Sequence, residues 1–151
     1  MIWTMPPFVT MALLSMADRI MQSEPSQTLE EYGEQYLQRW ILEKHSMTGS
    51  VYIHRILRSD YDEELHDHPG DNLSLILLGE MTEITEKGSR QLTPGTAVLR
   101  KNSERHRLEL EEPVVTMWIM GERVREWGFW DKEGNFTPSQ EFFHRRSRPL
   151  S

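Results

Sequence analysis

The chain has 151 residues and a mass of 17.9 kDa, which fits one domain of ordinary size. Lys and Arg number 17 against 24 Asp and Glu, and this formal charge of -7 repels phosphate backbones and anionic lipids, so we predict neither nucleic acid nor a membrane as partner. The absence of cysteine excludes disulfides, a cysteine nucleophile and thiolate metal ligands, and it fits a reducing, cytoplasmic location.

The first 28 residues predict a helix followed by a linker. Pro6 and Pro7 suit a helix start, and apolar residues then recur near helical spacing, so we predict an amphipathic helix over residues 7–21 and a linker over 23–28. The apolar face of this helix needs a partner. In order of preference, we expect the domain's own surface, a second copy of the chain or a membrane surface, because Arg19 is the helix's one basic residue.

From residue 36 onward, short apolar runs alternate with turn residues, a pattern typical of an all-β sandwich or barrel. Pro69-Gly70-Asp71, Lys87-Gly88 and Thr93-Pro94-Gly95 are the clearest turns. The predicted strands cover residues 37–42, 50–57, 64–68, 73–80, 81–86, 88–92, 97–100, 106–110 and 114–120. We predict a single all-β barrel domain of roughly eight strands over residues 29–144, with an interior for one small ligand, and a frayed tail over 145–151.

The segment from Leu65 to Asn72 carries the strongest chemical signal. His66 and His68 lie two residues apart, so on a strand they point to the same face while Asp67 points away. His106 follows a predicted strand whose antiparallel return can bring it beside this pair, and Asp71 is the nearest candidate carboxylate ligand. Three neutral imidazoles with open positions suit a catalytic Fe(II), Mn(II), Ni(II), Cu(II) or Zn(II). The alternative is that these histidines are ordinary hydrogen-bonded or surface residues.

Polar side chains on the neighbouring predicted strands are candidates for the lining of the same interior. As catalytic candidates we name Tyr52 and His54, and as substrate-binding candidates Arg55, Arg58, Ser74 and Trp118. An inward arginine can clamp a carboxylate or phosphate through two hydrogen bonds, whereas an outward one covers the barrel surface. Strand alternation does not decide which alternate set faces inward.

The order of these features resembles the two motifs of the cupin superfamily. The first motif is H-x-H, three or four residues, E, six residues and G. His66, His68 and Gly79 match it, and Asn72 stands in the glutamate position. The second motif is P-x-G-x-x-H after a Pro-Gly turn. His106 and the turn Pro94-Gly95 match it, while Lys101 and Ser103 replace its Pro and Gly. The resemblance spans residues 36 to 130 and implies a jelly-roll barrel.

A His-Asp-His sequence without the following glutamate is similar to that of the thiol dioxygenases, whose iron is held by three histidines. This resemblance implies Fe(II) on His66, His68 and His106, with Mn(II), Ni(II) or Zn(II) as alternatives. The chain also looks like small bacterial and phage cupins of no assigned activity. We therefore expect an oxygenase acting on a small organic molecule. The alternatives are a metal-dependent lyase or isomerase in which Tyr52 or His54 moves a proton, and a non-catalytic binding module, which Asn72 favours. Cupins commonly pair through their sheets, so we also predict a homodimer.

Overall fold

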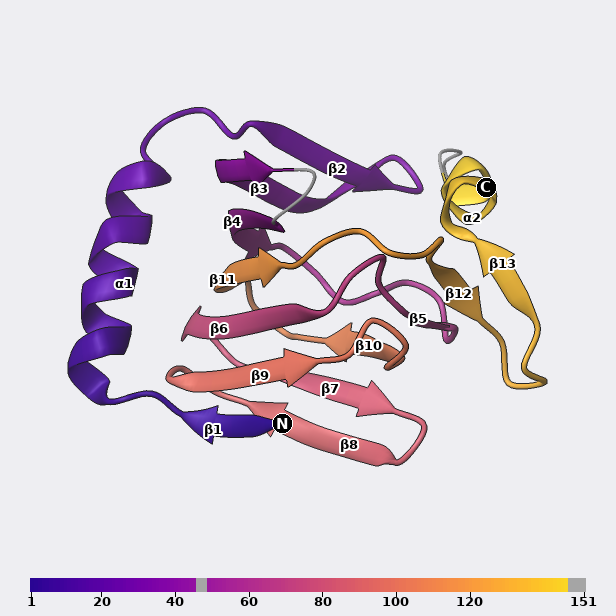
Figure 1. The fold of residues 1–151 in the computed structure, drawn as a ribbon. Coiled ribbons are helices and arrows are strands. Elements are labelled where there is room, and N and C mark those ends of the chain that lie inside the picture. The colour runs from indigo at the N-terminus through magenta and orange to yellow at the C-terminus, as the bar shows by residue number, and fades with distance from the viewer. Residues whose placement is uncertain (46–48, 147–151) are drawn as a thin grey trace.

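A computed structural model describes residues 1–45 and 49–146 of the chain. Strands are the main regular structure of the described chain, with one helix near each end (Figure 1). The elements are β1 (Ile2–Thr4), α1 (Pro7–Ile20), β2 (Gln27–Glu31), β3 (Glu34–His45), β4 (Gly49–Ile56), β5 (Leu65–His66), β6 (Asn72–Leu78), β7 (Met81–Thr85), β8 (Gly88–Leu92), β9 (Thr96–Arg100), β10 (His106–Glu109), β11 (Val114–Met120), β12 (Gly128–Trp130), β13 (Phe136–Pro138) and α2 (Ser139–Arg146).

The strands form two antiparallel sheets. The larger has the order β1-β9-β6-β11-β4-β3-β2, and the smaller has the order β13-β12-β5-β10-β7-β8. Chain neighbours such as β6 and β7 lie in different sheets, as in a jelly roll. The backbone ladders of the described strands stay within each sheet, so the predicted closed barrel is replaced by two open sheets with side chains between them.

Helix α1 packs against the outer face of the seven-stranded sheet and runs across the strand direction at one side of the molecule (Figure 1). Ala17 is fully buried and belongs to the same apolar cluster as Ile53 of β4 and Leu77 of β6. The predicted helix is therefore present within one residue, and its buried face contacts the chain's own sheet, the first of the three expected partners.

A second apolar cluster fills the space between the sheets. Ile56, Ile76 and Leu108 belong to it and are each at least 92% buried, with relative exposures of 5%, 0% and 8%. Because side chains alternate along a strand, Ile53 packs under α1 while Tyr52 and His54 face the interior. The order of residues in β4 therefore supplies both an outer core and a ligand-facing wall.

The structure contains elements that the sequence pattern did not predict. These are β1, β2, β12, β13 and α2. The predicted linker ends earlier than expected, because Gln27 and Thr28 pair with β3. Of the predicted tail, Arg145 and Arg146 belong to α2, and residues 147–151 lie outside the described part of the chain. Neither described helix has the length and apolarity that crossing a bilayer takes.

Candidate metal centre and its cavity

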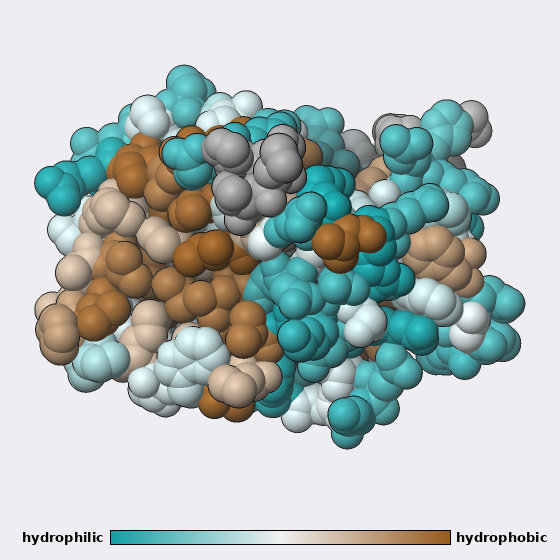
Figure 2. Space-filling view, viewed as in Figure 1, coloured by the Kyte–Doolittle hydropathy of each residue, from teal (hydrophilic) through white to brown (hydrophobic). Residues whose placement is uncertain are grey.

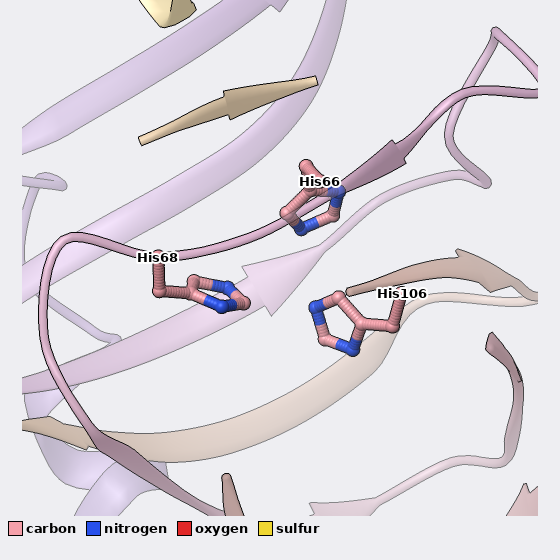
Figure 3. Close-up of side chains that lie close together, drawn as sticks. All are labelled: His66, His68 and His106. Atoms are coloured by element: carbon pink, nitrogen blue, oxygen red, sulfur yellow. The ribbon is translucent and has the colours of Figure 1, made fainter. Parts of the chain in front are cut away.

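Three histidines converge between the sheets. His66 belongs to β5, His68 lies in the segment that follows, and His106 begins β10, where it is the register partner of His66. One possible ligand nitrogen from each ring lies within 4.8 Å of the others. The ring centroids are 4.6 Å apart for His66 and His106, 5.0 Å for His68 and His106, and 5.2 Å for His66 and His68. Figure 3 shows the rings pointing into one common space.

Asp67 points to the opposite side, as the alternation of a strand requires. It is 1% exposed, and its carboxylate accepts hydrogen bonds of 2.9 Å from the Gly128 backbone N–H and from Trp130 Nε1. Arg125 forms an ion pair of 2.9 Å with it. The residue between the two candidate ligands therefore attaches β12 to their segment.

The electrostatics of the cluster fit a divalent cation. Nδ1 of His106 donates to Glu83 Oε1 at 3.1 Å, which leaves Nε2 of the neutral ring as an electron-pair donor. Nδ1 of His68 is buried without a hydrogen-bond partner among the described residues. Burial lowers the pKa of both rings below the usual value, and the charge of Arg100 lowers each further. Neutral imidazoles are the protonation state that binds metal.

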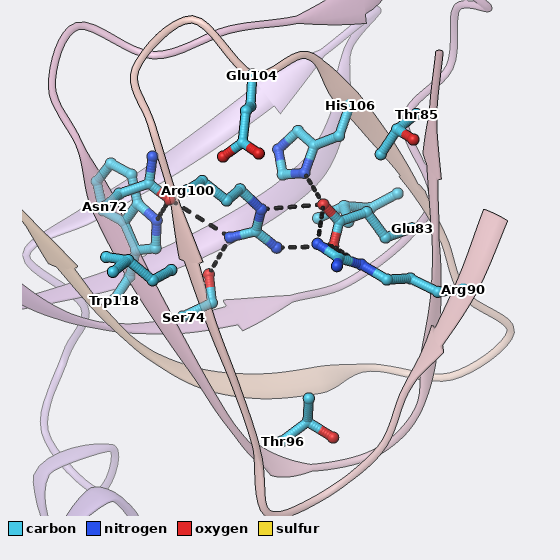
Figure 4. Close-up of polar contacts among 12 residues, drawn as sticks. Asn72, Ser74, Glu83, Thr85, Arg90, Thr96, Arg100, Glu104, His106 and Trp118 are labelled. Carbon is cyan, nitrogen blue, oxygen red and sulfur yellow. Dashed lines mark hydrogen bonds and ion pairs between the residues drawn. The ribbon is translucent and has the colours of Figure 1, made fainter. Parts of the chain in front are cut away.

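A buried polar network supports His106 from behind (Figure 4). Glu83 accepts hydrogen bonds of 3.0 Å from Nε and Nη2 of Arg100, as well as the contact from His106. Burial by itself would raise the pKa of Glu83, but these donors outweigh burial and hold the pKa far below its usual value. The carboxylate is therefore ionised and orients the His106 ring.

Asn72, which occupies the glutamate position of the first motif, belongs to this network. Its Oδ1 accepts from Nη1 of Arg100 at 3.4 Å and from Nε1 of Trp118 at 3.3 Å. Arg100 also donates to Ser74 Oγ at 2.8 Å. The buried Arg100 guanidinium therefore lies beside the position where the first motif has a glutamate, and the amide oxygen of Asn72 accepts a hydrogen bond from it there.

A cavity of about 240 Å³ opens onto the three histidines. Besides the histidines, four predicted site residues line it: Tyr52 and His54 of β4, Ser74 of β6 and Trp118 of β11. The ring of Trp118 stacks on Tyr52 and on His54, with centroid distances of 5.8 and 5.5 Å. Burial lowers the pKa of His54 well below its usual value, and the charge of Arg39 adds to this effect, so the ring is neutral. Trp127 and Phe129 give the opposite wall an aromatic surface.

The other predicted residues lie outside this cavity lining. Arg55 is exposed on the outer side of β4. Arg58 follows β4, forms an ion pair of 3.6 Å with Glu31 and stacks on Tyr61. Asp71 lies outside the histidine group, because its carboxylate accepts hydrogen bonds from the backbone N–H and side chain of Asn102, at 2.8 and 2.9 Å.

Several charged residues of the site region were not predicted, among them Glu83, Arg100, Arg39 and Arg123. For two of them, the alternation of side chains along a strand could have indicated an inward position. Glu83 shares a strand face with the apolar Met81, and Arg100 shares one with Val98, so each is a charged residue at an inward position. Arg39 lies on β3 opposite His54, which depends on the pairing of two strands. Arg123 lies in the segment after β11, which is neither helix nor strand, so no regular spacing of side chains predicts where it points.

Comparison with known proteins identifies the fold. No protein-family model and no curated protein matches the sequence. Among solved structures, the DMSP lyase DddQ of Ruegeria pomeroyi superposes with a TM-score of 0.54 at 19% identity, over 66% of this chain and 54% of that one. This chain thus spans just over half the length of DddQ.

Two further solved structures cover more of their own chains. A protein of Klebsiella pneumoniae with a double-stranded β-helix domain has a TM-score of 0.53 at 13% identity, over 75% of this chain and 87% of that one. A cupin superfamily protein of Desulfitobacterium hafniense has a TM-score of 0.50 at 15% identity, over 66% and 82%. The two facing sheets, the histidines between them and these superpositions together show that the chain has the jelly-roll, double-stranded β-helix fold of the cupins.

Proposed function

We propose that this protein is a metal-dependent cupin enzyme that acts on a small organic molecule. The convergence of His66, His68 and His106 carries the proposal, because three ligand nitrogens lie within 4.8 Å of one another beside a cavity. Three protein ligands leave open coordination positions, which is the arrangement of catalytic rather than structural sites. The ionised Glu83 behind His106 is the partner that metal-binding histidines usually have.

When bound, a divalent metal would supply Lewis acidity, and iron would add redox chemistry with dioxygen. We propose Fe(II) as the metal and an oxygenase as the reaction class, with Mn(II), Ni(II) and Zn(II) as alternatives. Among the structural neighbours, one is named an Fe(II) protein, Fe(II)-HppE, and another a lyase, DddQ. The first name supports the choice of Fe(II), and the second supports keeping the lyase as an alternative.

For the lyase or isomerase alternative, the cavity offers Tyr52 as the proton-transfer group. Nε2 of His54 already accepts a hydrogen bond of 2.9 Å from Arg39 Nε, so this nitrogen is occupied and the ring carries its proton on Nδ1. His54 can therefore donate a hydrogen bond to a substrate but is a poor base. The Tyr52 hydroxyl is the remaining candidate of the pair.

Metal uptake tests the proposal. Untagged protein is reconstituted anaerobically with Fe(II), Mn(II), Ni(II) or Zn(II), and bound metal is measured by plasma mass spectrometry. We expect near-stoichiometric uptake by the wild type. His106→Ala should lose metal affinity by more than about 100-fold, which is the largest loss usual for mutating a residue that only supports a metal ligand. His144→Ala, which changes an exposed histidine of α2, is the matched control. A His106→Ala affinity within about tenfold of this control would contradict the site.

Oxygen dependence separates the two reaction classes. The Fe(II)-loaded protein is screened against small organic acids with and without dioxygen, and products are identified by mass spectrometry. Turnover only with dioxygen, with oxygen consumed in step, supports the oxygenase. Turnover without dioxygen that is lost in Tyr52→Phe supports the lyase or isomerase. Failure of the wild type to take up any of these metals would favour the non-catalytic binding module.

A further inference from the structure

Three arginines line the cavity that holds the three histidines, and Arg100 is the one that is paired with a buried carboxylate, Glu83. The other two are Arg39 and Arg123. Arg39 belongs to β3 and Arg123 follows β11. Arg39 is held in place, because its Nε donates to His54 Nε2 at 2.9 Å and its Nη1 to Gln27 Oε1 at 3.1 Å. Its guanidinium also lies 4.8 Å from the ring centroid of Tyr52. A guanidinium has five N–H donors, so donors remain after these two hydrogen bonds.

Neither arginine has a carboxylate partner among residues 1–45 and 49–146 of the described chain. In this they differ from the other arginines of the cavity region that are at least partly buried. Arg100, which is 3% exposed, is paired with Glu83 at 3.0 Å, and Arg58 is paired with Glu31 at 3.6 Å. Burial lowers the pKa of Arg39, and the charge of Arg123 lowers it further, although Tyr52 acts in the opposite direction. The two positive charges are therefore close enough to disfavour each other.

The carboxylates that line the same cavity do not neutralise these charges. Glu31 is the ion-pair partner of Arg58. Asp60 accepts hydrogen bonds from Tyr36 Oη at 2.8 Å and from the Leu108 backbone N–H at 2.7 Å. Both are thus engaged with other groups. In a protein with a net charge of -7, Arg39 and Arg123 make a local excess of positive charge at this cavity, and a bound anion can neutralise it.

We propose that Arg39 and Arg123 bind an anionic group of the substrate, a carboxylate or a phosphate, within the cavity of the three histidines. Arginine suits both groups, because its planar fork can donate two parallel hydrogen bonds to either one. The cavity volume of about 240 Å³ is below the roughly 300–1,000 Å³ of pockets for drug-sized ligands, so the substrate is a small organic anion. This assignment rests on the proposed function for its link to a substrate, but the anion site can be tested without metal.

The test uses three small probes and the metal-free full-length protein. Propanoate and methyl phosphate carry the two candidate anionic groups, and propanamide is the neutral counterpart of propanoate. Binding is followed by calorimetry and by tryptophan fluorescence, since Trp118 and Trp127 line the cavity. The variants are Arg39→Gln, Arg39→Lys and Arg123→Gln, with Arg19→Gln as the matched control, because Arg19 is an exposed residue of α1. Circular dichroism checks that each variant is folded.

We expect at least one anion to bind about tenfold or more tightly than propanamide. Arg39→Gln and Arg123→Gln should each weaken this binding by about tenfold, Arg39→Lys should restore part of the loss, and Arg19→Gln should leave it unchanged. The anion that binds more tightly identifies the group. The same measurements with Zn(II)-loaded protein show whether metal and anion bind together.

Three results would overturn the anion site: no saturable binding of either anion, binding of both anions that is no tighter than that of propanamide, or anion binding by both Arg39→Gln and Arg123→Gln that equals that of Arg19→Gln. Because Arg123 is exposed, Arg123→Gln keeps the test decisive even if Arg39→Gln fails to fold. Anion binding that depends on arginine, without any metal uptake by the wild type, would refute the metal-dependent function and leave the anion site standing. Metal uptake without such anion binding would refute the anion site and leave the metal-dependent function standing.

Discussion

Replacing Glu83 by Gln keeps the size of the side chain and removes the charge that links His106 to Arg100. The lost carboxylate no longer orients His106 or raises its basicity, so we expect metal affinity to fall by about 10–100-fold, equivalent to about 1.4–2.7 kcal/mol. The same change leaves the guanidinium of Arg100, which is 3% exposed, without its buried counter-charge. Stranding a buried charge costs about 3–5 kcal/mol, so the free energy of unfolding should fall by that amount.

Two measurements and two further variants separate these effects. Zn(II) affinity is measured by competition with a chromophoric chelator, and stability by urea unfolding of the metal-free protein. Glu86→Gln is the control, since Glu86 is an exposed carboxylate that follows β7 directly and pairs with Arg105 at 3.6 Å. Adding Arg100→Met to Glu83→Gln removes the stranded charge and should recover stability but not metal affinity. A Glu83→Gln protein whose metal affinity matches that of Glu86→Gln would refute the role of Glu83.

Two other predictions follow from the buried histidine of the cavity and from the exposed apolar side chains. The pKa of His54 is lower in the folded state than in the unfolded chain, where it is near 6.5. Between these two pKa values the unfolded chain binds more protons than the folded protein. The free energy of unfolding should therefore fall as the pH drops below about 6.5, and this residue contributes up to about 1.4 kcal/mol per pH unit. Urea unfolding of His54→Gln should show a flatter pH dependence than the wild type, whereas an unchanged slope relative to His144→Gln would contradict the assignment. We also propose the homodimer, because Phe8 and Met11 of α1 are 74% and 71% exposed and apolar residues gather on the side of the molecule that α1 occupies (Figure 2). Light scattering should give twice the chain mass for the wild type and one chain mass for Phe8→Ser with Met11→Ser, and a monomeric wild type would refute this interface.

The regular part of the fold was predictable because its signals are local. Each of the nine predicted strand ranges overlaps a strand of the structure, since turns and alternation mark them in the sequence. The elements that were missed depend on tertiary contacts. Strand β12 has three residues, and the carboxylate of Asp67 holds it at Gly128 and Trp130. Three residues are too few to show the two-residue alternation that predicts a strand.

The site was predictable where one strand carried the pattern. The spacing of His66 and His68 and the turn before His106 pointed to the group that the structure brings together. The lining was harder to predict, because β4 offers two alternate faces and the choice between them depends on the helix that covers one of them. The structure places α1 over Ile53, which directs His54 inward and Arg55 outward.

The attachment of β12 to the segment of the two histidines has a thermodynamic consequence. Strand β5 comprises only Leu65–His66, so beside its pairing with β10 the segment of the two histidines relies on the contacts of Asp67 with Gly128, Trp130 and Arg125. Strand β12 in turn pairs with β13, which leads directly into α2. Local opening of this C-terminal edge is therefore coupled to the metal-binding arrangement. Amide hydrogens of β12 should therefore exchange with solvent more slowly once a ligand occupies the centre.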